Sequence, residues 1–250
     1  MTKILKTEEF INEQVVNEMR MRVKNRNNQQ KITDLLKRYN LVYNEETGLY
    51  DCNGDVKVEK DLVSPDGKLI VKFGVVKGDF DCRDNELTSL AGAPQKVSKG
   101  FYCNNNELTS LEGAPQEVGG DFDCGDNQLT SLEGVPQEVG GYFGCSNNKL
   151  TSLNGVTQEV GGSFYCYNNE LTSLEGAPQE VGGNFDCSGN QLTSLEGVPQ
   201  KVGGYFYCDN NNFVFDEFHF YGCLPDVIGG KLDAGPDCDY ELAKDYYNKR

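Results

Sequence analysis

Residues 119–139 read GGDFDCGDNQLTSLEGVPQEV, and close variants of this stretch follow one another through the middle of a 250-residue chain. A Phe precedes the central cysteine by two positions, an Asn follows it by three, and in most copies Leu follows at five and eight. A fixed period of about 20–50 residues is typical of a solenoid, in which each copy forms one coil and neighbours bury a shared core. The cysteine recurs every 21 residues, at Cys82, Cys103, Cys124, Cys145, Cys166, Cys187 and Cys208.

The same residues predict the path of each coil. Phe-x-Cys alternates with a period of two, so we expect Phe and Cys on one side of a short strand and the residue between them on the other. The Asn comes where the chain leaves the strand, and its amide can bond backbone groups that have no sheet partner there. Gly-x-Pro predicts a second bend and Gly-Gly a third. No stretch of the repeat is long enough for a helix, so we expect an extended or 3₁₀-like return path.

The charge of the chain is unevenly distributed around a net −16. Residues 1–40 hold nine Lys and Arg against five Asp and Glu, a net of +4, whereas residues 79–208 hold five against eighteen, a net of −13. So acidic a repeat region repels phosphate backbones and lipid headgroups, which argues against direct binding of nucleic acid or membrane. The chain has no signal-like apolar run and no stretch of about 18 apolar residues. We therefore expect a cytoplasmic protein whose ten cysteines are thiols.

The segments on either side of the repeats are predicted to be caps. Asn53-Gly54 lies between alternating segments and predicts a β-hairpin. Val56 and Val58 are expected in the Phe and Cys positions of a degenerate first coil. The predicted regions are 1–40, a helical segment; 41–78, a β-rich N-terminal cap or degenerate repeat; 79–212, the seven repeats; and 213–250, a C-terminal cap and tail.

The motif F-x-C-x-x-N-x-L-x-x-L resembles the leucine-rich repeat pattern L-x-L-x-x-N-x-L, with Phe and Cys in its two strand positions. The length of the repeat is similar to that of the short repeats of secreted bacterial effectors. The sequence NNELTSLEGAPQEVGG resembles repeat arrays encoded by tailed phages and some bacteria. The resemblance covers residues 79–212 and departs from the pattern where V-G-G-x-F replaces the usual L-x-x-L opening. It implies an α/β-type repeat solenoid, mostly β, with a parallel concave sheet between an N-terminal helical segment and a C-terminal cap.

The cysteine column is predicted to be part of the core, and no cofactor is expected. Equivalent residues of stacked strands lie about 4.8 Å apart, so the cysteines form a line, whereas a zinc site needs converging ligands. A metal or redox role for the column is the alternative. A second alternative is a terminal Cys₃His site made by Cys208, His219, Cys223 and Cys238, although no tight C-x₂₋₄-C spacing is present. With one histidine and no G-x-S-x-G motif or phosphate loop, the chain is not expected to be an enzyme.

The positions that differ between copies carry the functional prediction. The residue before each Phe and the residue between Phe and Cys change from coil to coil and are predicted to point away from the core. They divide into an acidic half and an aromatic half, a composition typical of protein interfaces that also attract a basic partner. A passive β-surface would accept the same residues. The predicted partner-binding residues on the concave face are Asp79, Asp81, Tyr102, Asp121, Asp123, Tyr142, Tyr165, Tyr167, Asp186, Tyr205 and Tyr207.

These residues predict a non-enzymatic scaffold that binds another protein, one with a basic surface. The resemblance to phage-encoded arrays implies an accessory protein that captures or blocks a host factor, such as a defence protein, in the host cytoplasm. Three alternatives stay open. The acidic solenoid could mimic nucleic acid and occupy a DNA-binding protein, the basic segment 20–31 could be the active element, or the C-terminal Cys/His group could bind a structural metal.

Overall fold

The computed structural model describes residues 30, 33–34, 36–213, 227–228 and 232–233. The chain divides into two compact units, Met1–Val42 and Tyr43–Arg250, and the second contains the repeats. Residues 30, 33–34 and 36–38 are helical, while most of the predicted N-terminal helical segment lies outside the described residues. In the described part of the chain, no helix is long and apolar enough to cross a membrane.

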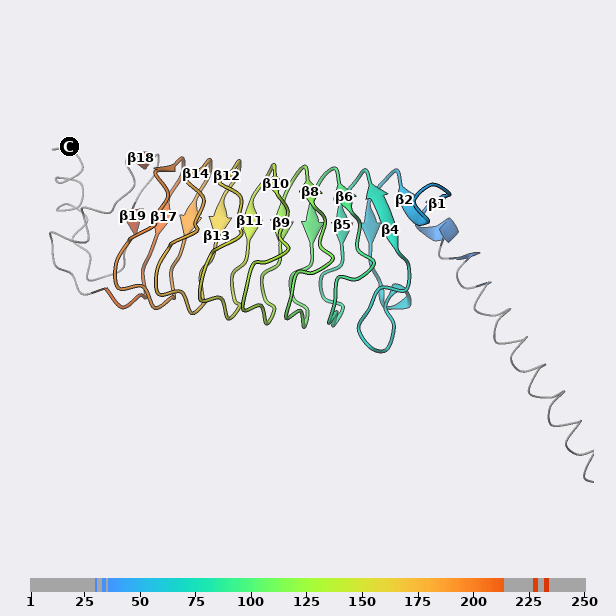
Figure 1. The fold of residues 1–250 in the computed structure, drawn as a ribbon, viewed down its shortest axis with the longest axis horizontal. Coiled ribbons are helices and arrows are strands. Elements are labelled where there is room, and N and C mark those ends of the chain that lie inside the picture. The colour runs from blue at the N-terminus through green and yellow to red at the C-terminus, as the bar shows by residue number, and fades with distance from the viewer. Residues whose placement is uncertain (1–29, 31–32, 35, 214–226, 229–231, 234–250) are drawn as a thin grey trace, which may run out of the picture. The chain divides into compact units, whose positions relative to one another are not determined.

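The second unit is a parallel β-solenoid built from short strands on two sides of each coil (Figure 1). One side is a nine-stranded sheet in the order β19-β17-β15-β13-β11-β9-β7-β5-β3, which we call the Phe sheet because Phe begins most of its strands. Its strands are β3 (Val56–Lys57), β5 (Phe80–Asp81), β7 (Phe101–Tyr102), β9 (Phe122–Asp123), β11 (Phe143–Gly144), β13 (Phe164–Tyr165), β15 (Phe185–Asp186), β17 (Phe206–Tyr207) and β19 (Leu232–Asp233).

The other side consists of two sheets, which we call the Val sheets because Val ends most of their strands. Their orders are β1-β2-β4-β6-β8-β10 and β12-β14-β16-β18. Their strands are β1 (Leu41–Asn44), β2 (Leu49–Cys52), β4 (Phe73–Val76), β6 (Lys96–Val97), β8 (Glu117–Val118), β10 (Glu138–Val139), β12 (Glu159–Val160), β14 (Glu180–Val181), β16 (Lys201–Val202) and β18 (Val227–Ile228). A 3₁₀ turn, η1 (Lys60–Leu62), follows β3.

A Gly-Gly corner joins the two strands in the last five repeats, where it confirms the third predicted bend, whereas Lys77-Gly78 and Ser98-Lys99 stand at this corner in the first two. Gly119 and Gly120 directly follow β8, and Asp121 separates them from β9. The coils stack closely at this corner. A Cβ atom on Gly140 would lie 2.2 Å from the carbonyl O of Gly119 in the preceding coil, which only glycine avoids.

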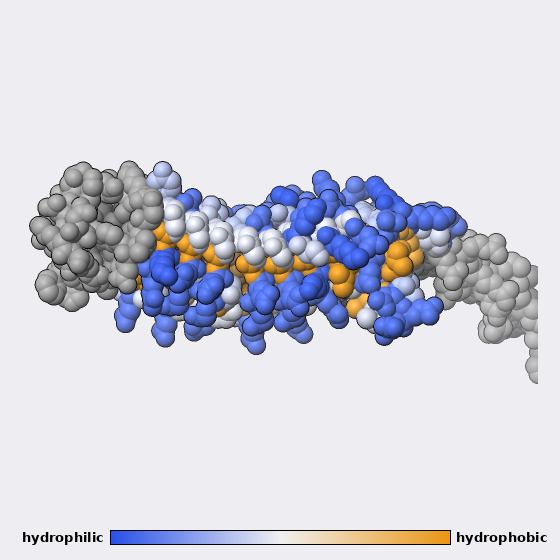
Figure 2. Space-filling model, turned by 90° about the horizontal axis from the view of Figure 1, so that it is seen from above, coloured by the Kyte–Doolittle hydropathy of each residue, from blue (hydrophilic) through white to orange (hydrophobic). Residues whose placement is uncertain are grey.

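The core consists of columns of identical side chains, one from each coil. Neighbouring Phe rings from β5 to β17 have centroids between 5.3 and 5.7 Å apart. The Phe and Cys of every repeat are fully buried, which confirms that they face inward. Seen from above (Figure 2), hydrophobic residues are visible mainly along one narrow line, with hydrophilic residues on one side and residues of intermediate hydropathy along most of the other. Among the described residues the exposed large hydrophobic side chains are those of Val42, Tyr43, Ile70 and Tyr205, so stacking covers most of the others, as expected for a thin repeated core.

The repeated Asn links each coil to the one before it. The amide of Asn127 donates to the carbonyl O atoms of Cys103 at 3.0 Å, Cys124 at 3.1 Å and Gly125 at 2.9 Å. Its Oδ1 accepts a hydrogen bond from the backbone N–H of Leu108 at 2.9 Å. Because Cys103 and Leu108 belong to the preceding coil, one buried side chain satisfies backbone groups of two coils. The same donors and carbonyls recur at Asn148, Asn169, Asn190 and Asn211.

The hairpin predicted at Asn53-Gly54 is wrong. β2 and β3, on either side of this pair, do not pair with each other: β2 pairs in parallel with β4, and β3 in parallel with β5. The dipeptide instead turns a corner of the first coil, in the place that Gly-Gly takes later, because stacking coils satisfy the backbone groups that a hairpin would pair. Val56 aligns with Phe80, and Val56 and Val58 are both buried, so their expected place in the core columns is confirmed.

Both sides of the solenoid continue beyond the last repeat. β18 pairs with β16 and β19 with β17, in parallel, and Leu232 aligns with Phe206. These strands fall within the segment 213–250 that was predicted as a cap, most of which lies outside the described residues. The sequence carries a signal for them, because PDVIGG at 225–230 is similar to PQKVGG at 199–204.

Candidate functional site

The predicted partner-binding residues lie on or next to strands of the Phe sheet, outside the core. Ten of the eleven are half-buried, and the Tyr205 side chain is 46% exposed. The residue between Phe and Cys points outward from its strand, as the alternation predicts. We call the set Asp79, Asp81, Tyr102, Asp121, Asp123, Tyr142, Tyr165, Tyr167, Asp186, Tyr205 and Tyr207 the Asp/Tyr face.

The acidic residues that precede the Phe position have a structural role that the sequence did not suggest. Asp79 and Asp121 each accept a hydrogen bond from a backbone N–H one coil further on, at 2.8 and 2.9 Å. Ser163 and Asn184 do the same in later coils, at 3.0 and 2.9 Å. A short polar side chain at this corner therefore satisfies a backbone donor that lies just outside the strand pairing. Part of the variation between copies is explained by this role.

The aspartates inside the strands bond their own coil. Asp81, Asp123 and Asp186 each accept a hydrogen bond from the backbone N–H two residues further on, at 3.2, 3.0 and 3.0 Å. This is a local side-chain turn that Asp forms readily. These carboxylates are consequently held in one orientation at the surface of the Phe sheet.

Arg83 begins a chain of polar contacts that runs across neighbouring coils. Its guanidinium donates to Asp81 at 2.8 Å and lies over the ring of Tyr102, 4.9 Å from the ring centroid. The Tyr102 hydroxyl donates in turn to Asp121 at 3.2 Å. Gly100 provides the room for this ring, since a Cβ atom there would lie 2.4 Å from the Tyr102 hydroxyl. Burial raises the pKa of Tyr102 to about 12, so the phenol stays a donor at neutral pH.

Tyr142 continues the chain one coil further on. Its hydroxyl donates to Asp123 at 2.9 Å, and its ring lies 6.0 Å from the ring of Tyr165. Gly144 leaves space here too, because a Cβ atom on it would lie 2.9 Å from Oδ1 of Asp123. Burial raises the pKa of the Asp123 carboxyl and also that of the Tyr142 phenol. The acidic half of the Asp/Tyr face is thus a set of groups that already bond one another.

The aromatic half differs, because three of its tyrosine hydroxyls are open. Tyr165 and Tyr167 are half-buried, and the Tyr205 ring lies against Tyr207 with 5.9 Å between centroids. Among the described residues, the hydroxyls of Tyr165, Tyr167 and Tyr205 have no hydrogen-bond partner. Asp186 is the one carboxylate of this half, and burial raises its pKa. This half therefore presents aromatic rings with unused polar groups.

The buried cysteines are poor candidates for reaction chemistry. All the described cysteines are free thiols and buried. Burial raises the pKa of the Cys124 thiol well above its usual value, which disfavours the reactive thiolate. Within the described ranges, no group of three or more His, Cys, Asp or Glu residues is arranged to hold a metal ion. Of the predicted terminal group, Cys208 is buried, and His219, Cys223 and Cys238 lie outside the described residues.

The Asp/Tyr face thus combines an internally bonded acidic half with an aromatic half in which three tyrosine hydroxyls are open. A scan against protein-family models finds no match, and searches of curated proteins and of solved structures find none. The arrangement of the side chains is therefore the basis on which a function is assigned.

Proposed function

We propose that this chain is a non-enzymatic scaffold of the leucine-rich-repeat type that binds a basic protein through the Asp/Tyr face. The proposal rests on one observation: among the described residues, the hydroxyls of Tyr165, Tyr167 and Tyr205 have no hydrogen-bond partner. A tyrosine in this state offers a large contact area and a polar group while losing little conformational entropy on binding. Tyrosine is enriched at the centres of protein interfaces for this reason.

The acidic half supports the choice of a basic partner. Asp81 and Asp123 are held by hydrogen bonds from their own backbone, so a partner that meets them does not have to order them first. Residues 79–208 carry a net charge of −13, which attracts a positive surface over a distance of about one Debye length. In this proposal the carboxylates guide the partner and the tyrosines retain it.

The leucine-rich-repeat assignment is supported by the motif and by the place of its residues in the coil. Phe and Cys occupy inward strand positions, and the Asn that follows bonds backbone groups of two coils. The leucine-rich-repeat motif does not predict the Val sheets, and in this respect the chain departs from the pattern. The further proposal of a phage accessory protein that captures a host defence protein in the host cytoplasm rests on the resemblance of the repeat to phage-encoded arrays.

The test is capture of a protein from a bacterial lysate by the immobilised chain, repeated with Tyr165→Ala and Tyr205→Ala together. Loss of a central interface tyrosine weakens binding by about 2 kcal/mol, or about 30-fold. Tyr43→Ala is a matched control, because Tyr43 is 53% exposed and lies outside the Asp/Tyr face. Crosslinking from position 165 would place the captured protein on the face.

Equal capture by the double variant and the control would contradict the proposal. Capture that falls steeply with salt and tolerates both tyrosine changes would instead favour an acidic mimic of nucleic acid.

A further inference from the structure

The Val sheets are interrupted at one junction between coils. At neighbouring junctions the first glycine of the corner bonds the preceding coil, as where Gly140 N–H donates to the carbonyl O of Val118 at 3.1 Å. Gly161 makes no such bond to Val139, and β10 and β12 belong to different sheets. The Phe sheet is continuous across the same two coils, since β11 pairs with β13. The coils therefore separate on one side only.

The interruption coincides with a row of like charges. One exposed column across the Val sheets consists of Lys96, Glu117, Glu138, Glu159, Glu180 and Lys201. The lysines at its two ends form ion pairs with the adjacent glutamates, Glu117 and Glu180. The inner residues, Glu138 and Glu159, form no ion pair among the described residues and lie on the two strands that fail to pair. Like charges opposite each other on neighbouring strands destabilise pairing.

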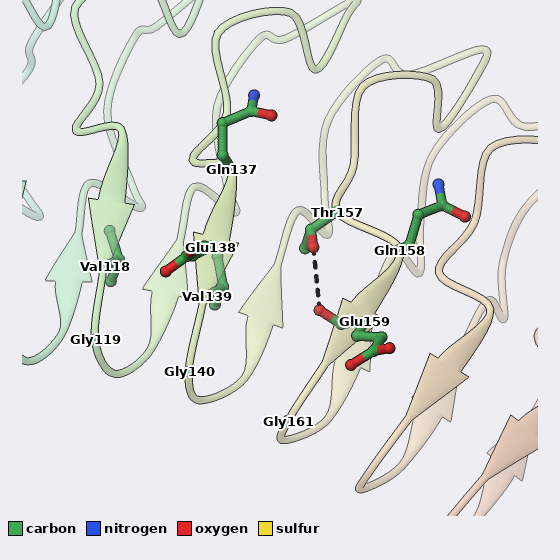
Figure 3. Close-up of a pocket in the computed structure, with 10 residues that line it drawn as sticks. All are labelled: Val118, Gly119, Gln137, Glu138, Val139, Gly140, Thr157, Gln158, Glu159 and Gly161. Carbon is green, nitrogen blue, oxygen red and sulfur yellow. Dashed lines mark hydrogen bonds between the residues drawn. The ribbon is translucent and has the colours of Figure 1, made fainter.

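The coil that follows the interrupted junction also differs from its neighbours at one position of the repeat. Thr157 stands where the repeats before and after it have a buried proline, Pro136 and Pro178. Its hydroxyl donates to the carbonyl O of Glu159 at 3.2 Å (Figure 3). Proline has a fixed φ and no N–H, so the other coils enter their strands with a preset backbone that this coil lacks.

The separated strands border a groove of about 460 Å³ (Figure 3). Its lining includes Glu138 and Glu159, whose carboxylates turn away from each other in this view. The carbonyl O atoms of Gln137 and Val139 have no ladder partner here, although the equivalent atoms accept hydrogen bonds at the junctions on either side. Unpaired backbone groups at strand edges are a recurrent binding site for partner segments.

We propose that this groove binds an arginine side chain from a basic protein partner. It offers the carbonyl O atoms of Gln137 and Val139, the backbone N–H groups of Gln158 and Gly161, and two carboxylates that form no ion pair, so its charge is net negative. A guanidinium supplies N–H donors for the two carbonyls and a positive charge that complements the two carboxylates, and a neutral amide or a hydroxyl lacks that charge. A cation in the groove also offsets the negative charge that Glu138 and Glu159 place on its two sides.

This contact is separate from the Asp/Tyr face. The groove lies on the Val side of the coils, across the Gly-Gly corner from the Phe sheet, and none of its lining residues belongs to that face. A partner with a basic segment could occupy either surface alone, so each can be tested without the other.

The test is an NMR titration of the full chain with the peptide acetyl-Gly-Arg-Gly-amide, and with the same peptide carrying neutral citrulline. The expected result is a saturable shift of the backbone amide signals of Gln158 and Gly161 with the arginine peptide only. One side chain binds weakly, with a dissociation constant on the order of 1 mM. Tyr165→Ala leaves these shifts in place, which separates this proposal from binding at the Asp/Tyr face.

Two sets of variants decide whether the site is specific. Glu138→Gln with Glu159→Gln should weaken binding at least about tenfold, whereas Glu112→Gln with Glu133→Gln removes the same charge elsewhere and should change it little. Thr157→Pro gives this coil the proline of its neighbours, so it should close the groove and abolish the shifts while leaving every carboxylate in place.

Equal weakening by the two glutamate pairs, or equal shifts with the citrulline peptide, would overturn the proposal. So would unchanged binding by a folded Thr157→Pro protein; if that variant does not fold, the glutamate pairs decide alone. A concentration-dependent dimer that Glu138→Gln with Glu159→Gln abolishes would also overturn it, because the occupant would then be a second copy of the chain.

Discussion

Replacing Asn127 by Ala tests whether the Asn column holds neighbouring coils together. The change removes three donated hydrogen bonds and the acceptor of the buried Leu108 N–H. Each of the three carbonyls keeps another donor from a neighbouring Asn. The N–H of Leu108 keeps no acceptor, so it becomes an unsatisfied donor in the buried interior of the coil.

The expected loss follows from that difference. An unsatisfied buried N–H costs about 1–3 kcal/mol, and the three weakened carbonyls add a smaller amount, which together give about 2–4 kcal/mol.

Asn127→Asp keeps the acceptor for Leu108 but turns the donor into a carboxylate that faces three carbonyls. Burial should raise the pKa of the new carboxyl above its unfolded value. Its stabilising protonated form is then present at low pH and lost as pH rises through the folded pKa, so this variant should recover stability in acid.

The measurement is the free energy of unfolding from urea denaturation, followed by circular dichroism and by tyrosine fluorescence, since the chain has no Trp. Gln128→Ala is the matched control, because Gln128 is exposed and is the next residue along the chain. We expect the control to change stability by less than about 0.5 kcal/mol. An Asn127→Ala protein that is as stable as the control would refute the reasoning and show that water replaces the amide.

Three further predictions concern the polar groups and the thiols. Tyr142→Phe should destabilise the chain by about 1–2 kcal/mol in urea denaturation, because Asp123 loses a hydrogen bond; no change would mean that the contact is not formed in solution. Hydrogen bonding from Ser64 lowers the pKa of Asp66 to about 2, so Ser64→Ala should return that pKa toward its usual value in an NMR titration. The stabilisation from this bond is present above the usual pKa of Asp66 and lost as pH falls toward 2. At pH 8, a thiol reagent should modify at most the two cysteines outside the described residues before unfolding and all ten in urea; rapid reaction of more than two would contradict the buried column.

The inward columns of the solenoid could be predicted because repetition fixes their register. Once Phe122 and Cys124 are placed on the inner side of a strand, the same positions in the other repeats have to follow. The role of Asn127 at the corner could also be predicted, because a buried amide must bond nearby backbone groups.

Other features depend on contacts between coils that one coil does not reveal. The strands of the Val sheets are two residues long in the repeats, as in β8, and so short a strand shows no alternation. The corner bond of Asp121 is formed only when a second coil supplies the donor, so its sequence position suggests a surface residue. The Asn53-Gly54 dipeptide is a strong hairpin signal, but parallel stacking of neighbouring coils takes its place.

The direction of the Asn contacts has a consequence for how the chain is made. Each Asn bonds backbone groups of the coil that precedes its own, as Asn127 does with Cys103 and Leu108. Because synthesis runs from the N-terminus to the C-terminus, a coil leaving the ribosome is incomplete until the next coil arrives with its Asn. Asn211 is the last residue of this column. The coil that contains Asn211 is therefore followed by no further Asn of this column.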